Sequence, residues 1–477
     1  MNSRFYIYLL AVGLVSIAPT RLRAAAPDGQ PGISTEVAGA SLQLANPSAA
    51  FIQRTMKQLS DSTPEHPARV RVLFYGQSIT AQPWTSAVKK ELQQRFPSVQ
   101  FEFHNPAIGG FTSPSLVRTA EPDLYPWYPD LLIFHVYGPM EPYEEIIRKT
   151  RERTCAEIIL HTDHISTQPQ ANQEESDRRV GQMADIARRY DCMLIDVRAK
   201  WIRYLSENGK EAQSLLRDTI HLNEAGCALL AKCVNEELLR LPQMGDGAAS
   251  AGQVTRIGLD SPAVTRTPDG ALTLRFSGNR VDAITDGSSS GGALELILDG
   301  KPAAEHREIW AAARTSTLGA GFPSPWVPAI KCVQFEQAPL AETWTLTCLE
   351  DSTPDGGRVF KVEGSVTGED GTGRVSQRFV SQSGRVVIEP GDWSSKGVAS
   401  GFKTTWKTYP CHAGTLPALK AGESAVLLQG AVNGEHTLTV SPGSGISGFR
   451  IYHPASAGMG KEIKKTASLI SGAKQKE

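Results

Sequence analysis

The sequence has no excess of charge of either sign. Its 477 residues include 49 Lys and Arg against 50 Asp and Glu, which gives a formal net charge of -1 at pH 7. Nucleic acids and anionic membrane surfaces are usually bound through an extended basic surface, which leaves an excess of Lys and Arg. We therefore expect neither a nucleic acid nor stable insertion into a membrane.

Transmembrane and metal-binding patterns are missing as well. The apolar run Phe5–Ala18 is shorter than the ~20 residues that span a bilayer as a helix. No spacing among the 7 Cys and 10 His residues matches a zinc site. No motif implies a metal or an organic cofactor.

The N-terminus has the pattern of a secretory signal peptide. A short basic start precedes Phe5–Ala18, and Ala24–Ala26 supplies small residues for cleavage. Arg21 and Arg23 lie between the two, so a retained membrane anchor is the alternative. We predict that residues 1–26 are removed and that the protein is periplasmic or extracellular.

Export would place the cysteines in an oxidising compartment, where disulfides form. Cys155 and Cys192 each begin a strand-like run and are one candidate pair. Cys332 and Cys348, in neighbouring strand-like runs, are another. The alternative is that all seven cysteines are buried thiols, because a chain of this length needs no covalent cross-links.

Strand-like and helix-like segments alternate over residues 67–243, after an N-terminal extension at 27–66. This alternation predicts an α/β domain with a doubly wound parallel sheet, covered by helices on both faces. The expected strands are 70–75, 99–104, 131–136, 157–161 and 192–197, and the expected helices are 84–96, 141–154, 173–190 and 224–241.

The second half of the chain has a different pattern of apolar and polar residues. A Gly- and Ala-rich segment predicts a linker at 244–253, and beyond it the helical periodicity disappears. Short alternating runs separated by turn pairs such as Asp299-Gly300 predict an all-β sandwich over residues 254–456. Residues 457–477 are expected to form a flexible basic tail.

A serine follows directly on the first strand of the α/β region. Ser78 lies at the carboxyl edge of the predicted sheet, where ligands bind in this architecture. A serine hydroxyl needs a base within hydrogen-bond reach before it acts as a nucleophile. Since Ser78 also lies near the start of the next helix, an N-cap role is the alternative.

The base and its acid are expected near the end of the α/β region. His221 lies between the last strand and the last helix, so its loop should open onto the same edge as Ser78. Asp218, three residues earlier, can orient one imidazole nitrogen while the other accepts the serine proton. Asp196 is an alternative acid, but its position at a strand end favours a structural role.

From about residue 68 to about residue 240, the chain resembles the SGNH (GDSL-like) hydrolases. Gly76–Thr80 matches their first block, except that Gln77 replaces the usual Asp, and Asp218–His221 matches their fifth. The resemblance implies a flavodoxin-like fold and a relay of Ser78, His221 and Asp218. The second block resembles Asn105–Thr112, which implies that the N–H groups of Gly110 and Ser78 donate to the oxyanion.

The third block departs from the family pattern. Gly-x-Asn-Asp falls on Gly138–Glu141, where Met140 replaces the asparagine whose amide normally donates to the oxyanion. One explanation is that the amide of Gln77 takes over this donation, since carbohydrate acetylesterases and sialate O-acetylesterases of the superfamily also carry Gly-Gln-Ser. The other explanation is a degraded site.

Three further residues are predicted to contact substrate. His164 and Tyr137 follow predicted strands at the active edge, and Trp326 lies in a proline-flanked loop that suits a sugar-stacking aromatic. A hydrogen-bonded loop is the alternative role for the His161–His164 segment, and burial or a substitute oxyanion donor is the alternative for His135 and Tyr137.

Together these features predict an exported serine esterase that hydrolyses small acyl esters, acetyl above all, on carbohydrate. The resemblance, the β region and export favour carbohydrate, although no single residue identifies a sugar. One alternative is a lipase or thioesterase for longer acyl chains. Another is a non-catalytic carbohydrate-binding protein with a degraded esterase site.

Overall fold

The computed structural model describes residues 51–168, 173–238, 253–289, 291–352, 357–442 and 445–455. These residues all belong to one unit of the chain, Asn46–Glu477. The predicted signal peptide, the tail and nearly all of the predicted linker lie outside the described residues.

Five parallel strands form the sheet of the α/β region, in the order β2-β1-β3-β4-β5. This order reverses direction at β1, which is the topology of flavodoxin-like sheets and puts the ligand crevice beyond the carboxyl ends of β1 and β3. The predicted α/β fold is confirmed. The strands are β1 (Arg69–Gly76), β2 (Gln100–His104), β3 (Leu131–His135), β4 (Glu157–His161) and β5 (Met193–Ile195).

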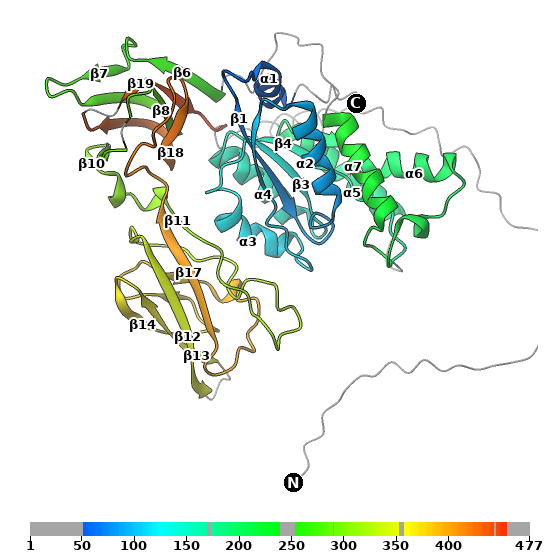
Figure 1. The fold of residues 1–477 in the computed structure, drawn as a ribbon. Coiled ribbons are helices and arrows are strands. Elements are labelled where there is room, and N and C mark those ends of the chain that lie inside the picture. Colours follow the sequence, from blue (N-terminus) through cyan, green and yellow to red (C-terminus); the bar gives the residue numbers. More distant parts are fainter. Residues whose placement is uncertain are drawn as a thin grey trace, which may run out of the picture. The chain divides into compact units, whose positions relative to one another are not determined.

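Helices cover both faces of this sheet, as Figure 1 shows. Alternate residues of β1 enter two different cores: Val72 and Phe74 pack with α1, α2, α6 and α7, and Leu73 and Tyr75 pack with α3, α4 and α5. Burial on both faces explains why the central strands β3 and β4 are almost entirely apolar, whereas the edge strand β2 alternates polar and apolar residues. The helices are α1 (Gln53–Asp61), α2 (Trp84–Arg95), α3 (Ser113–Asp123), α4 (Met140–Arg153), α5 (Gln173–Arg189), α6 (Val197–Glu207) and α7 (Glu224–Leu238).

Three of these helices, α1, α3 and α6, do not appear in the sequence-based prediction. Helix α1 lies within the segment predicted as an N-terminal extension. Helix α3 contains Pro114 in its first turn and Pro122 near its end, so its sequence resembles a loop. Helix α6 follows β5 without a connecting loop, because the Asp196 carboxylate caps it by accepting from Ala199 N. This bond fixes Asp196 in a structural role, as its position at a strand end indicated.

The C-terminal region is all antiparallel, as predicted, and consists of a seven-stranded sheet, a five-stranded sheet and a small β15-β16 pair. The two larger sheets contribute to different buried clusters, and the five-stranded sheet shares its cluster with the α3, α4 and α5 side of the α/β region. The seven-stranded sheet contains β6 (Val254–Gly258), β7 (Val264–Arg266), β8 (Leu272–Thr285), β9 (Leu296–Leu298), β10 (Lys301–Pro302), β18 (Ser424–Val440) and β19 (Ile446–Tyr452). The other strands are β11 (Trp310–Ala312), β12 (Glu342–Ser352), β13 (Arg358–Gly364), β14 (Gly368–Arg374), β15 (Phe379–Val380), β16 (Val387–Ile388) and β17 (Lys403–Pro410).

The expected disulfide candidates are not formed. All seven cysteines have free thiols, and six of them are buried. Cys155 packs with Tyr128 and Tyr452, whereas Cys192 belongs to a different cluster. Cys348 lies in β12, but Cys332 lies outside the strands, so these two do not face each other across a hairpin. Burial raises the pKa of the Cys192 thiol to about 11, which keeps it protonated and unreactive.

Within the described ranges, none of the helices combines the length and the apolar character needed to cross a bilayer.

Candidate active site

The loop after β1 holds Ser78 in a turn. Gly76 ends β1 beside His135, the last residue of β3. A Cβ at Gly76 would lie 2.2 Å from both His135 O and Thr80 Oγ1, so only glycine fits there. The backbone then closes a helical turn through Ala81 N to Gln77 O, 3.0 Å. Helix α2 begins only at Trp84, so Ser78 is not the N-cap of that helix.

The loop before α7 brings His221 to the same edge of the sheet. The loop closes on itself where Arg217 N donates to His221 O at 2.9 Å. Asn223 Oδ1 accepts from Gly226 N at 3.0 Å and caps the start of α7.

Ser78, His221 and Asp218 form a continuous chain of hydrogen bonds. Ser78 Oγ lies 2.9 Å from His221 Nε2, although the two residues are 143 positions apart. His221 Nδ1 lies 2.9 Å from Asp218 Oδ2. A hydroxyl, an imidazole and a carboxylate in this order have the geometry needed to remove a proton from the serine. The arrangement agrees with the resemblance to SGNH hydrolases.

Backbone donors hold the Asp218 carboxylate in place. Its Oδ1 accepts from His221 N at 2.7 Å and from Ile220 N at 2.9 Å. These bonds, with the contact to the His221 ring, lower the pKa of Asp218 to about 2. The side chain is 47% exposed, so this turn and not burial keeps the carboxylate oriented.

Two side chains outside the motifs hold the backbone on either side of His221. The Gln82 amide donates to Leu222 O at 2.9 Å and accepts from Leu222 N at 3.2 Å. His164 Nε2 bonds to Ile220 O at 2.7 Å. No local sequence pattern indicates this role of Gln82, because its partner lies 140 residues away.

The Asn105–Thr112 segment, between β2 and α3, lies beside Ser78; we call it the second-block loop. Asn105 Nδ2 donates to Thr80 O at 2.9 Å, and Ile108 N donates to Gly76 O at 3.2 Å. A Cβ at Gly109 would lie 3.8 Å from Ser78 Cβ. Gly110 has a φ of +83°, which favours glycine, and a Cβ there would meet nothing within 4 Å. The loop therefore approaches the serine and leaves space open at Gly110.

Gln77 is 6% exposed. No other described residue forms a hydrogen bond with its side-chain amide in this structure. The Gln77 amide is not among the described polar atoms that are fully buried without a partner, so it keeps some contact with the surface. A primary amide without a protein partner has N–H groups available to donate, as a substitute oxyanion donor requires.

The third-block segment contains no amide side chain and is held by Arg179 instead. Met140 is the first residue of α4, and its Sδ lies 2.9 Å from Arg179 Nη1. Arg179 also donates to Val136 O, Gly138 O and the Asp163 carboxylate. The sequence analysis did not identify Arg179, which helix α5 brings to this loop.

His164, predicted to contact substrate, is buried, with Nε2 on Ile220 O and Nδ1 3.5 Å from Tyr137 Oη. Neither nitrogen of the ring is left for a substrate, so the hydrogen-bonded loop is the role that fits His164. Burial lowers the pKa of His164 to about 4.

The two other histidines of this region are buried as well. His135 is bonded to Asp163 at 2.8 Å and stacks on His161 with ring centroids 4.4 Å apart. Since its ring lies in the protein interior, His135 is not a substitute oxyanion donor. Burial also lowers the pKa of His161, so the His161 ring is neutral at pH 7.

Trp326 lies against the second-block loop. Its Nε1 donates to Gly109 O at 3.0 Å, and 55% of the residue is exposed. The indole therefore reaches the neighbourhood of Ser78 while keeping much of its surface open. The proline-flanked position of Trp326 marks it as a candidate substrate contact, and its place beside this loop is consistent with that role.

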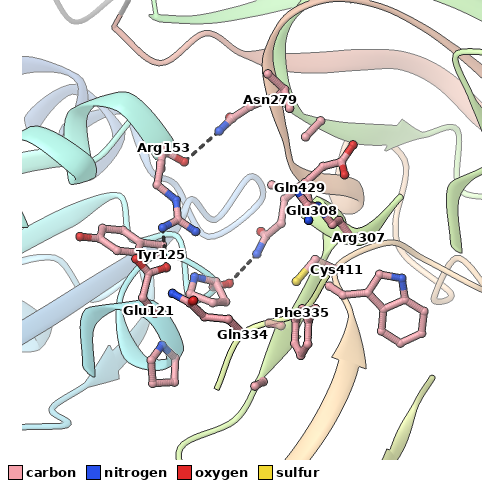
Figure 2. Close-up of a pocket in the computed structure, with 18 of the residues that line it drawn as sticks. Glu121, Tyr125, Arg153, Asn279, Arg307, Glu308, Gln334, Phe335, Cys411 and Gln429 are labelled. Atoms are coloured by element: carbon pink, nitrogen blue, oxygen red, sulfur yellow. Dashed lines mark hydrogen bonds and ion pairs between the residues drawn. The ribbon is translucent and has the colours of Figure 1, made fainter. Parts of the chain in front are cut away.

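A cavity of about 390 Å³ lies elsewhere, between α3, α4 and the β region (Figure 2). None of the predicted site residues lines it. Its polar side chains bond mainly to protein atoms: Arg153 to Glu121, Asn279 to Arg153 O, and Gln429 to Pro126 O. This cavity has no connection with the Ser78 chemistry. Among the described residues, no group of three His, Cys, Asp or Glu side chains could hold a metal ion.

No family model matches the chain, and no curated protein matches it. Similar solved structures include a two-domain esterase active on acetylated mannans, with 14% identity, 86% of this chain and 98% of that chain covered, and a TM-score of 0.37. Axe2, an acetylxylan esterase from Geobacillus stearothermophilus, is 23% identical; the match covers 35% of the present chain and 94% of Axe2, with a TM-score of 0.31. The acetyl xylan esterase AlAXEase is 22% identical; the match covers 35% of the present chain and 98% of AlAXEase, with a TM-score of 0.32. Since these TM-scores lie below 0.5, our conclusions rest on topology and side-chain geometry.

Proposed function

We propose that this protein is an exported serine esterase that removes small acyl groups, acetyl above all, from carbohydrate. The observation that carries the proposal is the chain of two 2.9 Å contacts from Ser78 through His221 to Asp218. It lies at the carboxyl edge of a parallel sheet beside an open glycine loop. Export rests on the signal-peptide pattern of residues 1–26.

In the proposed mechanism, Ser78 Oγ attacks the ester carbonyl while His221 Nε2 takes the serine proton. Asp218 holds Nδ1–H of the ring and stabilises the imidazolium that forms. His221 then gives the proton to the leaving sugar hydroxyl, which leaves an acyl group on Ser78. A water molecule, deprotonated by the same ring, hydrolyses this acyl-enzyme.

Negative charge on the carbonyl oxygen would be received by the N–H groups of Ser78 and Gly110 and by the Gln77 amide. The free amide of Gln77 and the open space at Gly110 support this assignment. Loss of one oxyanion donor typically lowers kcat by about 10²–10³. A Gln77→Ala variant is therefore expected to lose activity on that scale, whereas full activity would exclude Gln77 as a donor.

Carbohydrate is proposed as the acyl carrier because of the Gly-Gln-Ser block and the position of Trp326. An exposed indole face beside the nucleophile is a suitable platform for a sugar ring. Tyr137 follows β3 at the same edge, and its hydroxyl faces His164. We therefore propose that Tyr137 lines one side of the substrate site.

Acetate release from acetylated mannan, xylan and sialate, compared between the parent protein and Ser78→Ala, tests the proposal. We expect release from at least one substrate and at least a ~10³-fold loss in the variant. Preference for long-chain over short-chain p-nitrophenyl esters would favour a lipase or thioesterase. If a fluorophosphonate fails to label Ser78 while polysaccharide binding persists, the protein is a binding protein with a degraded site.

A further inference from the structure

The β region contacts the second-block loop at two backbone carbonyls. Arg314 Nη2 donates to Pro106 O at 2.6 Å, and Trp326 Nε1 donates to Gly109 O at 3.0 Å. Both donors follow β11, about two hundred residues beyond the loop they hold. Asn105 and Ile108 fix the loop to the Ser78 side, so it is held between the two regions.

The contact of Trp326 has a direct consequence for the proposed oxyanion donor. Gly109 C=O and Gly110 N–H belong to one peptide unit, and no peptide bond in the described residues is cis. A trans peptide is planar and directs its C=O and N–H to opposite sides. Fixing the Gly109 carbonyl on the indole therefore fixes the direction of the Gly110 N–H, on the side away from Trp326.

A hydrogen bond to the carbonyl also polarises the same peptide. Donation to the C=O strengthens donation from the N–H of the same peptide unit by about 10–30%. Gly110 adopts a positive φ that costs a glycine little, so its backbone has wide conformational freedom unless a contact restrains it. The turn bond from Phe111 N to Ile108 O, 3.3 Å, spans Gly109 and Gly110, and Trp326 adds a second restraint on the peptide between them.

Trp326 is itself held by a closed loop. Leu318 N donates to Val327 O at 2.9 Å, and Gly319 N donates to Pro325 O at 2.9 Å. Arg314, near the base of this loop, forms a bidentate pair with Asp123 at the end of α3, with contacts of 3.0 and 2.5 Å. Asp123 is buried, so the pair anchors this segment to the α/β region.

We propose that Trp326 is a positioning residue of the esterase reaction, because it orients and polarises the Gly109-Gly110 peptide that donates to the oxyanion. This inference rests on the proposed function. The β region then contributes to the chemical step and not only to substrate binding.

The test compares Trp326→Phe, which removes the indole N–H but keeps an aromatic face, with the parent protein on p-nitrophenyl acetate. This substrate has no sugar to stack on the ring. We expect kcat to fall by about 5–50-fold with little change in KM, less than complete loss of a donor would cause. The affinity for a trifluoromethyl ketone, which forms a tetrahedral oxyanion on Ser78, should fall by a similar factor.

Trp310→Phe is the matched control. The Trp310 indole N–H also donates to a backbone carbonyl, Ala304 O at 2.9 Å, but that carbonyl belongs to the β region. We expect this variant to keep the parent kcat, and both variants to keep the parent melting temperature.

An unchanged kcat in Trp326→Phe overturns the inference, and so does an equal loss of kcat in Trp310→Phe. A rise in KM for acetylated oligosaccharides without a change in kcat would reduce Trp326 to a substrate contact. In each case, activity that depends on Ser78 would leave the proposed function intact. Absence of that activity in the parent protein would remove both.

Discussion

Acidification should destabilise this protein through the buried histidines below the site, and His164 makes the effect measurable. Burial lowers the pKa of His164 to about 4, from the usual 6.5 of a histidine. The unfolded chain therefore binds a proton between these two pH values that the folded protein does not bind. Stability must fall as the pH decreases from about 6.5 to about 4.

The size of this effect follows from the two pKa values. Between pH 7.5 and pH 4.5, a shift of this size makes folding roughly 2–3 kcal/mol less favourable, at about 1.36 kcal/mol per pKa unit. For a domain of about 150–250 residues, this loss of stability corresponds to a fall of about 5–10 °C in Tm. Burial of His161 acts in the same direction.

The assay is thermal unfolding, followed by circular dichroism, of the parent and of His164→Gln at both pH values. Glutamine keeps an N–H donor for Ile220 O but does not titrate, so the variant should lose about 5–10 °C less on acidification. Each protein is compared with itself at pH 7.5, which removes any general destabilisation by the substitution. Equal losses of Tm in the two proteins would refute the assignment of a neutral, buried His164.

Four other predictions concern the loops and the thiols. Asp218→Asn should lower kcat by about 10²–10⁴ at pH 7 in ester hydrolysis assays, because the His221 ring loses the acceptor that orients it. Gln82→Leu leaves the buried N–H and C=O of Leu222 unpaired, so urea unfolding should show a loss of about 1–3 kcal/mol, and kcat should fall about tenfold. Met140→Asn should change kcat less than about threefold, since the side chain at this position faces Arg179; a tenfold increase would contradict this. Alkylation of the denatured, unreduced protein should give 7 adducts per chain, counted by mass spectrometry, and fewer adducts would indicate a disulfide.

The α/β fold could be predicted because its signals are local. Strands such as β3 and β4 are short, continuous apolar runs, and α5 and α7 have helical periodicity with recognisable ends. Helices α3 and α6 escaped prediction for local reasons too. Pro122 lies within α3, and α6 begins without a loop. In both cases the surrounding packing overrides the local signal.

The reacting groups of the candidate site could be proposed from the sequence, but the groups that hold them could not. Ser78, Asp218 and His221 lie in short blocks whose order and spacing carry information. Gln82 and Arg179 act through hydrogen bonds to backbone groups that are distant in the sequence, and such bonds leave no pattern in the sequence. His164 was noticed for its chemistry, and only its burial showed that it supports the loop.

These supporting contacts share one physical feature. It explains why the reacting residues lie in recognisable motifs, whereas the residues that hold the loops do not. Each joins a side chain to the backbone of a loop that has little regular structure of its own: Arg179 to the third-block segment, His164 and Gln82 to the His221 loop, Trp326 to the second-block loop. A loop without a backbone ladder keeps its shape only if its polar groups are satisfied from outside. The reacting atoms must stay within a few tenths of an ångström of one geometry, and that demand falls on these external donors. Transfer of the motif residues alone to another parallel sheet should therefore not transfer the activity, because the loops would keep the motif and lose its geometry.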